Sequence, residues 1–206
     1  MNAHPTPGCP RIPPFVLLGL LAVGGQVTRS ADLVSPVSSC VYDHGYGNDS
    51  VRGVALDSQG VLSAAGILRG NTSPEYLDAA CVMRYGAPEW RDILDLGPVS
   101  PGLRDEANDR FFDVATDSQD NVLVVGAKSG AWAGGDGYHV AALLRKYSPT
   151  GVLLWERLQS FGPWSTAYGV AVDGGGNVYV AGAVFGNWGA EEGQWAMWKY
   201  DAAGAL

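Results

Sequence analysis

The sequence holds few of the residue types from which catalytic and metal sites are built. Among its 206 residues, three are Cys and three are His. Neither a Cys-x-x-Cys nor a His-Glu-x-x-His spacing occurs, so the sequence does not predict a zinc site. A Gly-x-Ser-x-Gly elbow is also absent, and no Ser or Asp is paired with a His at an informative spacing. The sequence therefore offers no nucleophile and no general base, and we expect neither a metal nor another cofactor.

Basic residues are also scarce. Lys and Arg total 13 against 21 Asp and Glu, which gives a formal net charge of −8. A negative surface repels nucleic acid phosphates and anionic lipid headgroups. We therefore expect neither nucleic acid nor an anionic membrane as a partner.

Acidic residues are missing from the first 31 positions, which resemble an export signal. Residues 15–23 form an apolar run that is too short to span a bilayer comfortably, and Ala22 and Gly24 offer small residues for a cleavage site. We predict a signal peptide over residues 1–25, a linker over 26–40 and no stable membrane span after cleavage. An uncleaved anchor is the alternative. The predicted location is secreted, periplasmic or at the cell surface.

One short segment recurs three times along the chain. The copies align without a gap and span Gly53–Gly66, Asp113–Gly126 and Gly169–Gly182. The Asp at the fifth position recurs at steps of 60 and 56 residues. A repeat of this length, built of short alternating apolar runs around a turn, predicts a stack of small β-sheets.

The third copy shows the expected local structure most clearly. Tyr168, Val170 and Val172 alternate with smaller residues, and we place their side chains on one face of a strand. A Gly-rich turn that includes Gly176 follows, and it can adopt the positive φ that a tight hairpin needs before the next strand. The Asp residues expected to cap the three turns through backbone N–H groups are Asp57, Asp117 and Asp173. A calcium loop is the alternative, but it needs more ligands in a fixed order.

Each copy is followed by a third apolar strand that ends in a basic residue and Tyr, over residues 80–85, 142–147 and 195–200. Turn residues come next. A fourth strand then follows in two copies, over residues 89–94 and 152–157. Four antiparallel strands per repeat are the plan of a β-propeller blade.

The motifs Val-Ala-x-Asp-x-x-Gly-Asn-Val-Tyr-Val-x-Gly, Lys-Tyr-Asp-x-x-Gly and Leu-x-Trp resemble the bacterial β-propeller repeats of the SBBP type. The second copy departs from the family at Asp120, where Gly is preferred, and the first departs at Val61, where Asn is expected. The resemblance implies an all-β fold over residues 41–206, a β-propeller-like array of four-stranded antiparallel blades. It implies little about activity, because propellers host many functions.

The number of repeats implies an incomplete ring. Propellers have about four to eight blades, and three repeats are present. If residues 41–45 form an outer strand, the three modules span about 41–86, 88–147 and 152–200. The end sheets of such an array are exposed and apolar. We therefore expect either a fragment of a longer protein or a chain that self-associates or binds a protein partner.

Two Gly-rich loops carry the candidate ligand-binding residues. Trp132 and Asp136 follow the second hairpin, and Trp188 and Glu191 follow the third at an equivalent position. An exposed Trp beside acidic residues can stack on a sugar ring, which makes carbohydrate a candidate ligand. Anchoring of the loops is the alternative. The Trp residues expected to pack between blades are Trp90, Trp155, Trp195 and Trp198.

The cysteines allow one disulfide in an exported chain. Cys9 lies in the predicted signal, so Cys40 and Cys81 remain as an even pair in an oxidising compartment. The alternative is that Cys81 is a small core residue of an apolar strand.

Taken together, these observations favour an exported, non-enzymatic repeat protein that serves as a binding or interaction scaffold. No catalytic residue is predicted. One alternative is a propeller enzyme of the lyase or glycosidase type, whose acids would converge only in a closed ring. Another is a truncated remnant of a longer propeller protein.

Overall fold

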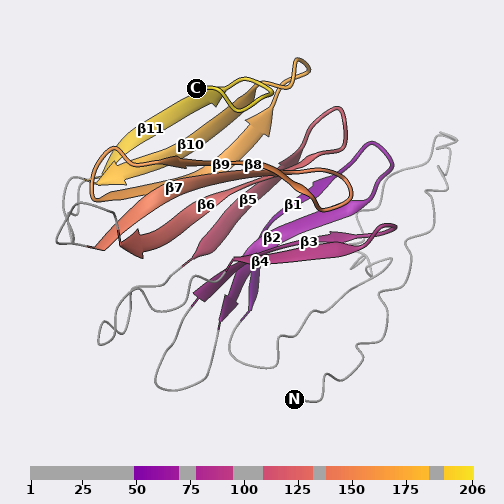
Figure 1. The fold of residues 1–206 in the computed structure, drawn as a ribbon, viewed down its shortest axis with the longest axis horizontal. Helices are drawn as coiled ribbons and strands as arrows, with labels where there is room; N and C mark the ends of the chain where they lie inside the picture. Colours follow the sequence, from indigo (N-terminus) through magenta and orange to yellow (C-terminus); the bar gives the residue numbers. More distant parts are fainter. Residues whose placement is uncertain (1–48, 70–77, 95–108, 132–137, 186–192) are drawn as a thin grey trace, which may run out of the picture. The chain divides into compact units, whose positions relative to one another are not determined.

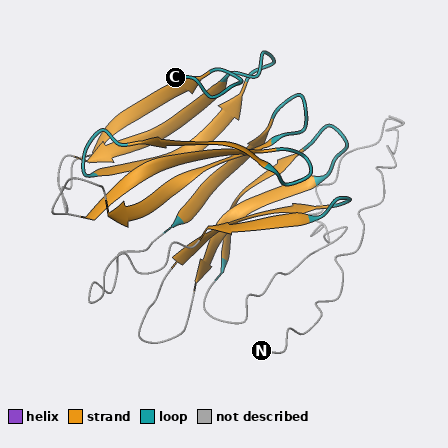
Figure 2. Ribbon diagram, viewed as in Figure 1, coloured by secondary structure: helices purple, strands orange, loops and turns teal. Residues whose placement is uncertain are grey.

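The computed structural model describes residues 49–69, 78–94, 109–131, 138–185 and 193–206. All of them belong to one compact unit, Asp43–Leu206. They form strands joined by turns, without a helix among them (Figure 2), which confirms the all-β prediction. The described part of the chain accordingly contains no helix able to cross a membrane. The predicted signal peptide, linker and outer strand at 41–45 lie outside the described residues.

Eleven strands lie in the described residues and follow one another along the chain (Figure 1). They are β1 (Ser50–Leu56), β2 (Leu62–Arg69), β3 (Asp78–Tyr85), β4 (Trp90–Leu94), β5 (Arg110–Thr116), β6 (Val122–Ala131), β7 (Tyr138–Tyr147), β8 (Leu153–Gln159), β9 (Trp164–Val172), β10 (Val178–Phe185) and β11 (Gly193–Tyr200).

The strands repeat one pairing order. β1 to β4 form an antiparallel sheet in chain order, here called sheet 1. β5 to β8 repeat this order as sheet 2, and β9 to β11 repeat its first three strands as sheet 3. One parallel bridge, between Val140 and Trp164, links β7 to β9 and joins sheets 2 and 3 into a seven-stranded sheet.

The pairing of the fourth strands differs from the grouping in the predicted modules. Those modules, about 88–147 and 152–200, place the fourth strands predicted over 89–94 and 152–157 with the strands that follow them. In the structure β4 pairs with β3 and β8 pairs with β7. Short turns explain this: in the turn before β8, Ser148 N donates to Val152 O and Gly151 N to Ser148 O, which folds β8 back on β7.

Each first strand carries a β-bulge at the same place. The pairing with the second strand skips Arg52 in β1, Phe112 in β5 and Tyr168 in β9. A bulge inserts one residue and re-aims its side chain. The prediction that Tyr168 shares a face with Val170 and Val172 is therefore wrong. Tyr168 is half exposed, whereas Ala167, Val170 and Val172 pack in the core.

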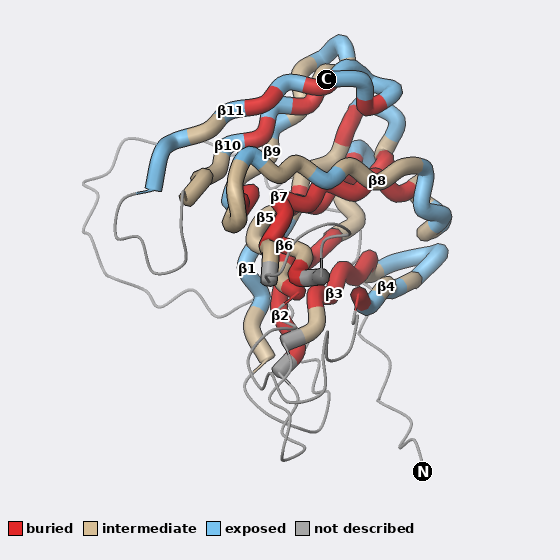
Figure 3. Tube along the Cα trace, turned by 60° about the vertical axis from the view of Figure 1, so that its left-hand side comes forward, coloured by how far each residue is buried: buried red, intermediate tan, exposed pale blue. Residues whose placement is uncertain are grey.

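Two apolar clusters join the sheets face to face. The first lies between sheets 1 and 2, and the second between sheets 2 and 3. Val82 and Leu144 hold equivalent positions in β3 and β7, and each lies on the face that meets the next sheet, here called the next-facing face. Tyr147 and Tyr200 are likewise equivalent, and they lie on the opposite face of their sheets, which meets the preceding sheet. Figure 3 shows the long buried stretches of β2, β3, β6 and β7 that result.

Tryptophans of the fourth strands reach across to the next sheet. Trp90 Nε1 donates a hydrogen bond of 3.0 Å to Pro149 O, and its ring lies against Gly151 in the same turn. The Trp155 ring lies against Gly204 in the equivalent turn of sheet 3. Trp198 is buried in the second cluster, but Trp195 is 98% exposed. The packing prediction is therefore wrong for Trp195 within one chain, because no described sheet covers its face.

Candidate functional site

A carboxylate closes each hairpin turn. Asp57 Oδ1 accepts hydrogen bonds from the backbone N–H of Gln59 at 3.0 Å and of Val61 at 2.7 Å. The carboxylates of Asp117 and Asp173 accept the equivalent pairs. The φ angles in these turns are positive at Gly60 (76°), Asp120 (62°) and Gly176 (80°). The four predicted turn residues thus lie in the turns, where one oxygen of each Asp is committed to the backbone.

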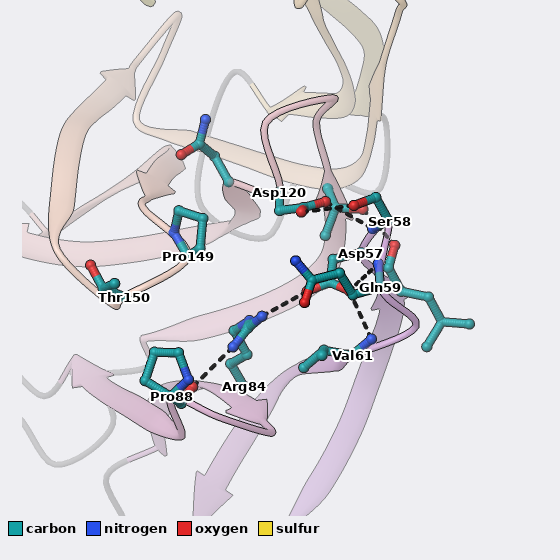
Figure 4. A network of polar contacts seen from close by, with 12 residues as sticks. Asp57, Ser58, Gln59, Val61, Arg84, Pro88, Asp120, Pro149 and Thr150 are labelled. Carbon is teal, nitrogen blue, oxygen red and sulfur yellow. Dashed lines mark hydrogen bonds and ion pairs between the residues drawn. The ribbon is translucent and has the colours of Figure 1, made fainter. Parts of the chain in front are cut away.

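The second carboxylate oxygen forms a buried ion pair in sheets 1 and 2. Asp57 Oδ2 accepts a hydrogen bond of 2.7 Å from Arg84 Nη2 (Figure 4). Asp117 Oδ2 lies 2.8 Å from Lys146 Nζ at the equivalent position of β7. All four side chains are at most 6% exposed, so these pairs are part of the junction with the next sheet.

In sheet 3 the equivalent basic residue and turn carboxylate do not form a buried ion pair. Lys199, the equivalent of Lys146, lies 5.2 Å above the ring of Tyr179 and is exposed. Asp173 Oδ2 accepts a hydrogen bond from Asn177 Nδ2, as Asp117 Oδ2 does from Asn121 Nδ2, but its other donor is Tyr179 Oη in place of a basic side chain. The buried pair therefore forms in the two sheets whose next-facing face is covered.

The protonation of these carboxylates follows from their partners. Burial alone would raise the pKa of Asp57, but hydrogen bonds from Val61, Arg84 and Gln59 outweigh it and hold that pKa below its usual value. Burial likewise acts to raise the pKa of Asp117, and the hydrogen bonds from Lys146 and Asn121 lower it overall. Both groups are ionised acceptors at neutral pH, so neither can serve as a general base poised to take a proton.

Asp120 links the turns of sheets 1 and 2. Its Oδ1 accepts a hydrogen bond of 2.8 Å from Ser58 N, and its Oδ2 accepts one of 2.9 Å from Ser58 Oγ (Figure 4). Asp tolerates the left-handed conformation better than most residues. The departure from Gly at this repeat position therefore adds a contact between sheets.

We expect Asp120→Ala to destabilise the protein by about 1–2 kcal/mol, because two hydrogen bonds to a charged group are lost and a left-handed Ala is strained. Asp120→Gly, the matched control, removes the same bonds but relieves the backbone, so its loss is smaller. Urea denaturation followed by circular dichroism measures both. Equal losses for the two variants would contradict the role of the backbone conformation.

A second polar network joins β4 to sheet 2. Asp92 Oδ2 accepts hydrogen bonds from Tyr147 Oη at 2.7 Å and from Arg145 Nη1 at 3.1 Å. Arg145 Nε donates to Glu156 Oε2 at 2.7 Å. Burial, reinforced by the hydrogen bond to Asp92, raises the pKa of Tyr147. The phenol therefore stays protonated at physiological pH and acts as a structural donor.

The bulges supply the exposed candidate site that sequence reasoning missed. Arg52, Phe112 and Tyr168 hold one position in the three first strands, and β5 lies against both β1 and β9. The rings of Phe112 and Tyr168 are 5.2 Å apart and tilted by 55°. Tyr168 is 50% exposed, and Arg52 is also exposed. We call these three residues the bulge row.

A break in alternation is the signal that could have found the bulges. In β1 the apolar residues Val51, Val54 and Leu56 are spaced by three and then by two positions. Ala167, Val170 and Val172 in β9 have the same spacing. Strict alternation cannot pass through a step of three without an inserted residue.

The bulge row offers stacking surfaces and positive charge. Aromatic faces pack against flat or apolar groups of a ligand, and the Arg52 guanidinium is a planar donor of several hydrogen bonds. Asp113, next to Phe112 in sequence, has its Oδ2 engaged by Val170 N at 2.9 Å. The arrangement can bind a ligand, but it does not pair an acid with a base.

The other predicted site residues lie elsewhere. Trp132, Asp136, Trp188 and Glu191 are outside the described residues, so the loop site stays a prediction. Cys40 is also outside them, and its disulfide with Cys81 stays a prediction. Cys81 is buried in β3 with a free thiol, and burial raises the pKa of Cys81 to about 12. Within the described ranges, no three His, Cys, Asp or Glu side chains are grouped so that they could hold a metal ion.

Comparison with models of known protein families found no match to this chain, and comparison with curated proteins found no relative. The likeness to SBBP-type repeats therefore remains an expectation from the motifs.

Proposed function

We propose that this chain is an exported, non-enzymatic binding scaffold whose sheets are blades of an incomplete β-propeller-like array. The repetition of one plan supports the array. Each sheet begins with a bulged strand, continues as an antiparallel meander and packs through equivalent faces on its neighbour. The described residues form three such sheets, fewer than the four to eight blades or so of a complete propeller.

One observation carries the proposal of binding rather than catalysis. The most buried charged pairs, Asp57 with Arg84 and Asp117 with Lys146, are engaged in turns and sheet junctions. At the equivalent bulge positions the first strands instead offer the exposed Tyr168, in ring contact with the half-buried Phe112, and the exposed Arg52. Such a surface recognises a ligand by stacking and hydrogen bonding without transferring a proton.

The ligand class that fits this surface best is carbohydrate. Sugar rings present apolar C–H faces that pack on aromatic rings, and their hydroxyl groups accept hydrogen bonds from a guanidinium. The proposal extends to the segments that follow β6 and β10 in sequence, which lie outside the described residues: Trp132 with Asp136, and Trp188 with Glu191, are further candidate sugar contacts. A lyase or glycosidase would instead need acids that converge on the substrate.

We expect Tyr168→Ala to lower the affinity for a bound polysaccharide about tenfold, since one stacking platform is worth roughly 1–1.5 kcal/mol. Phe161→Ala is the matched control, because Phe161 is also an exposed ring stacked on another ring, that of Trp198. Affinity electrophoresis against a panel of neutral and acidic polysaccharides measures retention of the full chain and both variants.

The same panel separates binding from catalysis. Retention that Tyr168→Ala weakens and Phe161→Ala leaves unchanged supports the proposal. Retention that is equal in all three proteins, or absent for every polysaccharide, contradicts the bulge row as a carbohydrate site. Release of reducing ends or of unsaturated sugars by the full chain would contradict the non-enzymatic assignment.

A further inference from the structure

The next-facing face of sheet 3 is exposed, whereas the equivalent faces of sheets 1 and 2 are buried against the sheet that follows. Trp195 is 98% exposed, Met197 87% and Tyr179 43%. The equivalent residues of sheet 2, which sheet 3 covers, are at most 5% exposed: Ala142, Leu144 and Leu123. In sheet 1 the equivalents of Trp195 and Met197 are fully buried: Ala80 and Val82. The uncovered face thus carries large apolar side chains at positions that are buried between sheets elsewhere in the chain, as expected of an interface.

The chain also exposes the surface that would cover such a face. Val51, Val54 and Leu56 of β1 are between 55% and 64% exposed. Their equivalents Phe111 and Val114 in β5 are buried against sheet 1, and Ala167 and Val170 in β9 pack against sheet 2. In both established junctions, therefore, these positions of the first strand cover the next-facing face of the preceding sheet.

We propose that the next-facing face of sheet 3 binds the β1 face of a second copy of this chain, head to tail. The contact continues a junction that already occurs twice within the chain, so its geometry needs no new type of packing. A second copy supplies the required first-strand face with its apolar residues already exposed. The contact is heterologous, with different surfaces of the two copies meeting.

Side chains at this position differ in size between the two junctions inside the chain. Phe111 of a first strand and Ala80 of a third strand belong to the first cluster. Their equivalents in the second cluster, Ala167 and Ala142, are both small. The proposed contact brings Val51 and Trp195 to these positions, so it holds a larger volume here than either internal junction.

Cross-linking of two differently marked copies tests the orientation. The full chain is made with Val54→Cys in one preparation and with Met197→Cys in another, the second carrying a size tag. Both carry Cys9→Ser and Cys40→Ser, while Cys81 is buried and its raised pKa keeps it a thiol. A short bismaleimide is added to each preparation alone and to the mixture.

Head-to-tail contact predicts a cross-linked product in the mixture, joining one chain of each kind, that exceeds the products of either preparation alone. Adding Trp195→Glu to the Met197→Cys chain should abolish the mixed product without changing its thermal unfolding, because Trp195 is 98% exposed. Adding Phe161→Ala instead should leave the product unchanged. The proposal is overturned if two Met197→Cys chains form the main product, if no product forms at high concentration, or if Trp195→Glu leaves the mixed product intact.

Discussion

Replacing Gly126 by Ala is expected to lower the free energy of unfolding by about 3 kcal/mol, the largest effect that we expect from adding one methyl group. A Cβ at this position would lie 1.8 Å from Arg110 O and 2.8 Å from Arg110 C. These are backbone atoms of the adjacent bulged strand, so no side-chain rotation relieves the collision. Urea denaturation followed by circular dichroism measures the loss.

Gly174→Ala is the matched control in the third hairpin. No heavy atom lies within 4 Å of a Cβ at Gly174, so its effect should stay within about 0.5 kcal/mol. The same close approach recurs in the other sheets, where a Cβ at Gly66 would meet Ser50 O at 2.1 Å and one at Gly182 would meet Thr166 O at 2.1 Å. An unchanged urea midpoint for Gly126→Ala would contradict the bulge as the reason for the repeated Gly.

Asp57→Ala is expected to destabilise the protein by about 3–5 kcal/mol, because it leaves the Arg84 guanidinium buried without its carboxylate. Asp173→Ala should have a much smaller effect, since its turn is on an uncovered sheet and holds no buried ion pair. Adding Arg84→Met to Asp57→Ala should recover a large part of the loss, because it removes the buried charge. Failure of Arg84→Met to restore stability would show that the lost turn, rather than the ion pair, dominates.

The pH dependence of this loss gives an independent check. The folded pKa of Asp57 is lowered, so its contribution is fully present above the ordinary value of about 4 and is lost as the pH falls through the lower folded value. The stability difference between the wild type and Asp57→Ala should therefore narrow as the pH falls below about 4. A difference that stays constant as the pH falls would contradict an ionised Asp57 in the folded state.

Local patterns predicted the strands well. The hairpin turns at Asp57, Asp117 and Asp173 and the two fourth strands lie where turn residues and alternation place them, since both signals depend on neighbours in sequence. Trp90 and Trp155 also pack between sheets as expected. The propeller-like array and the carbohydrate ligand are proposals, which rest on the repeated plan of the sheets and on the bulge row.

The bulges, the exposure of Trp195 and the partners of the turn carboxylates could not be predicted from the sequence, because they depend on contacts between distant strands. A bulge shifts the alternation by one residue, so a strict period of two placed Tyr168 on the wrong face. Trp195 matches buried positions in the other sheets, and only the arrangement of sheets reveals that nothing described covers it. The partners of Asp57 and Asp117 lie on third strands 27 and 29 residues further along, although the recurring basic residue before each Tyr was a usable hint.

The mass of the full chain in solution tests most directly whether the exposed faces of sheets 1 and 3 bind each other between copies. Native mass spectrometry over a range of concentrations should detect one chain of 21.6 kDa when dilute and multiples of that mass when concentrated. Trp195→Glu should shift the distribution toward the single chain at every concentration. A full chain that keeps the mass of one copy at the highest concentration, with or without Trp195→Glu, would contradict the account of equivalent sheets with open, complementary faces.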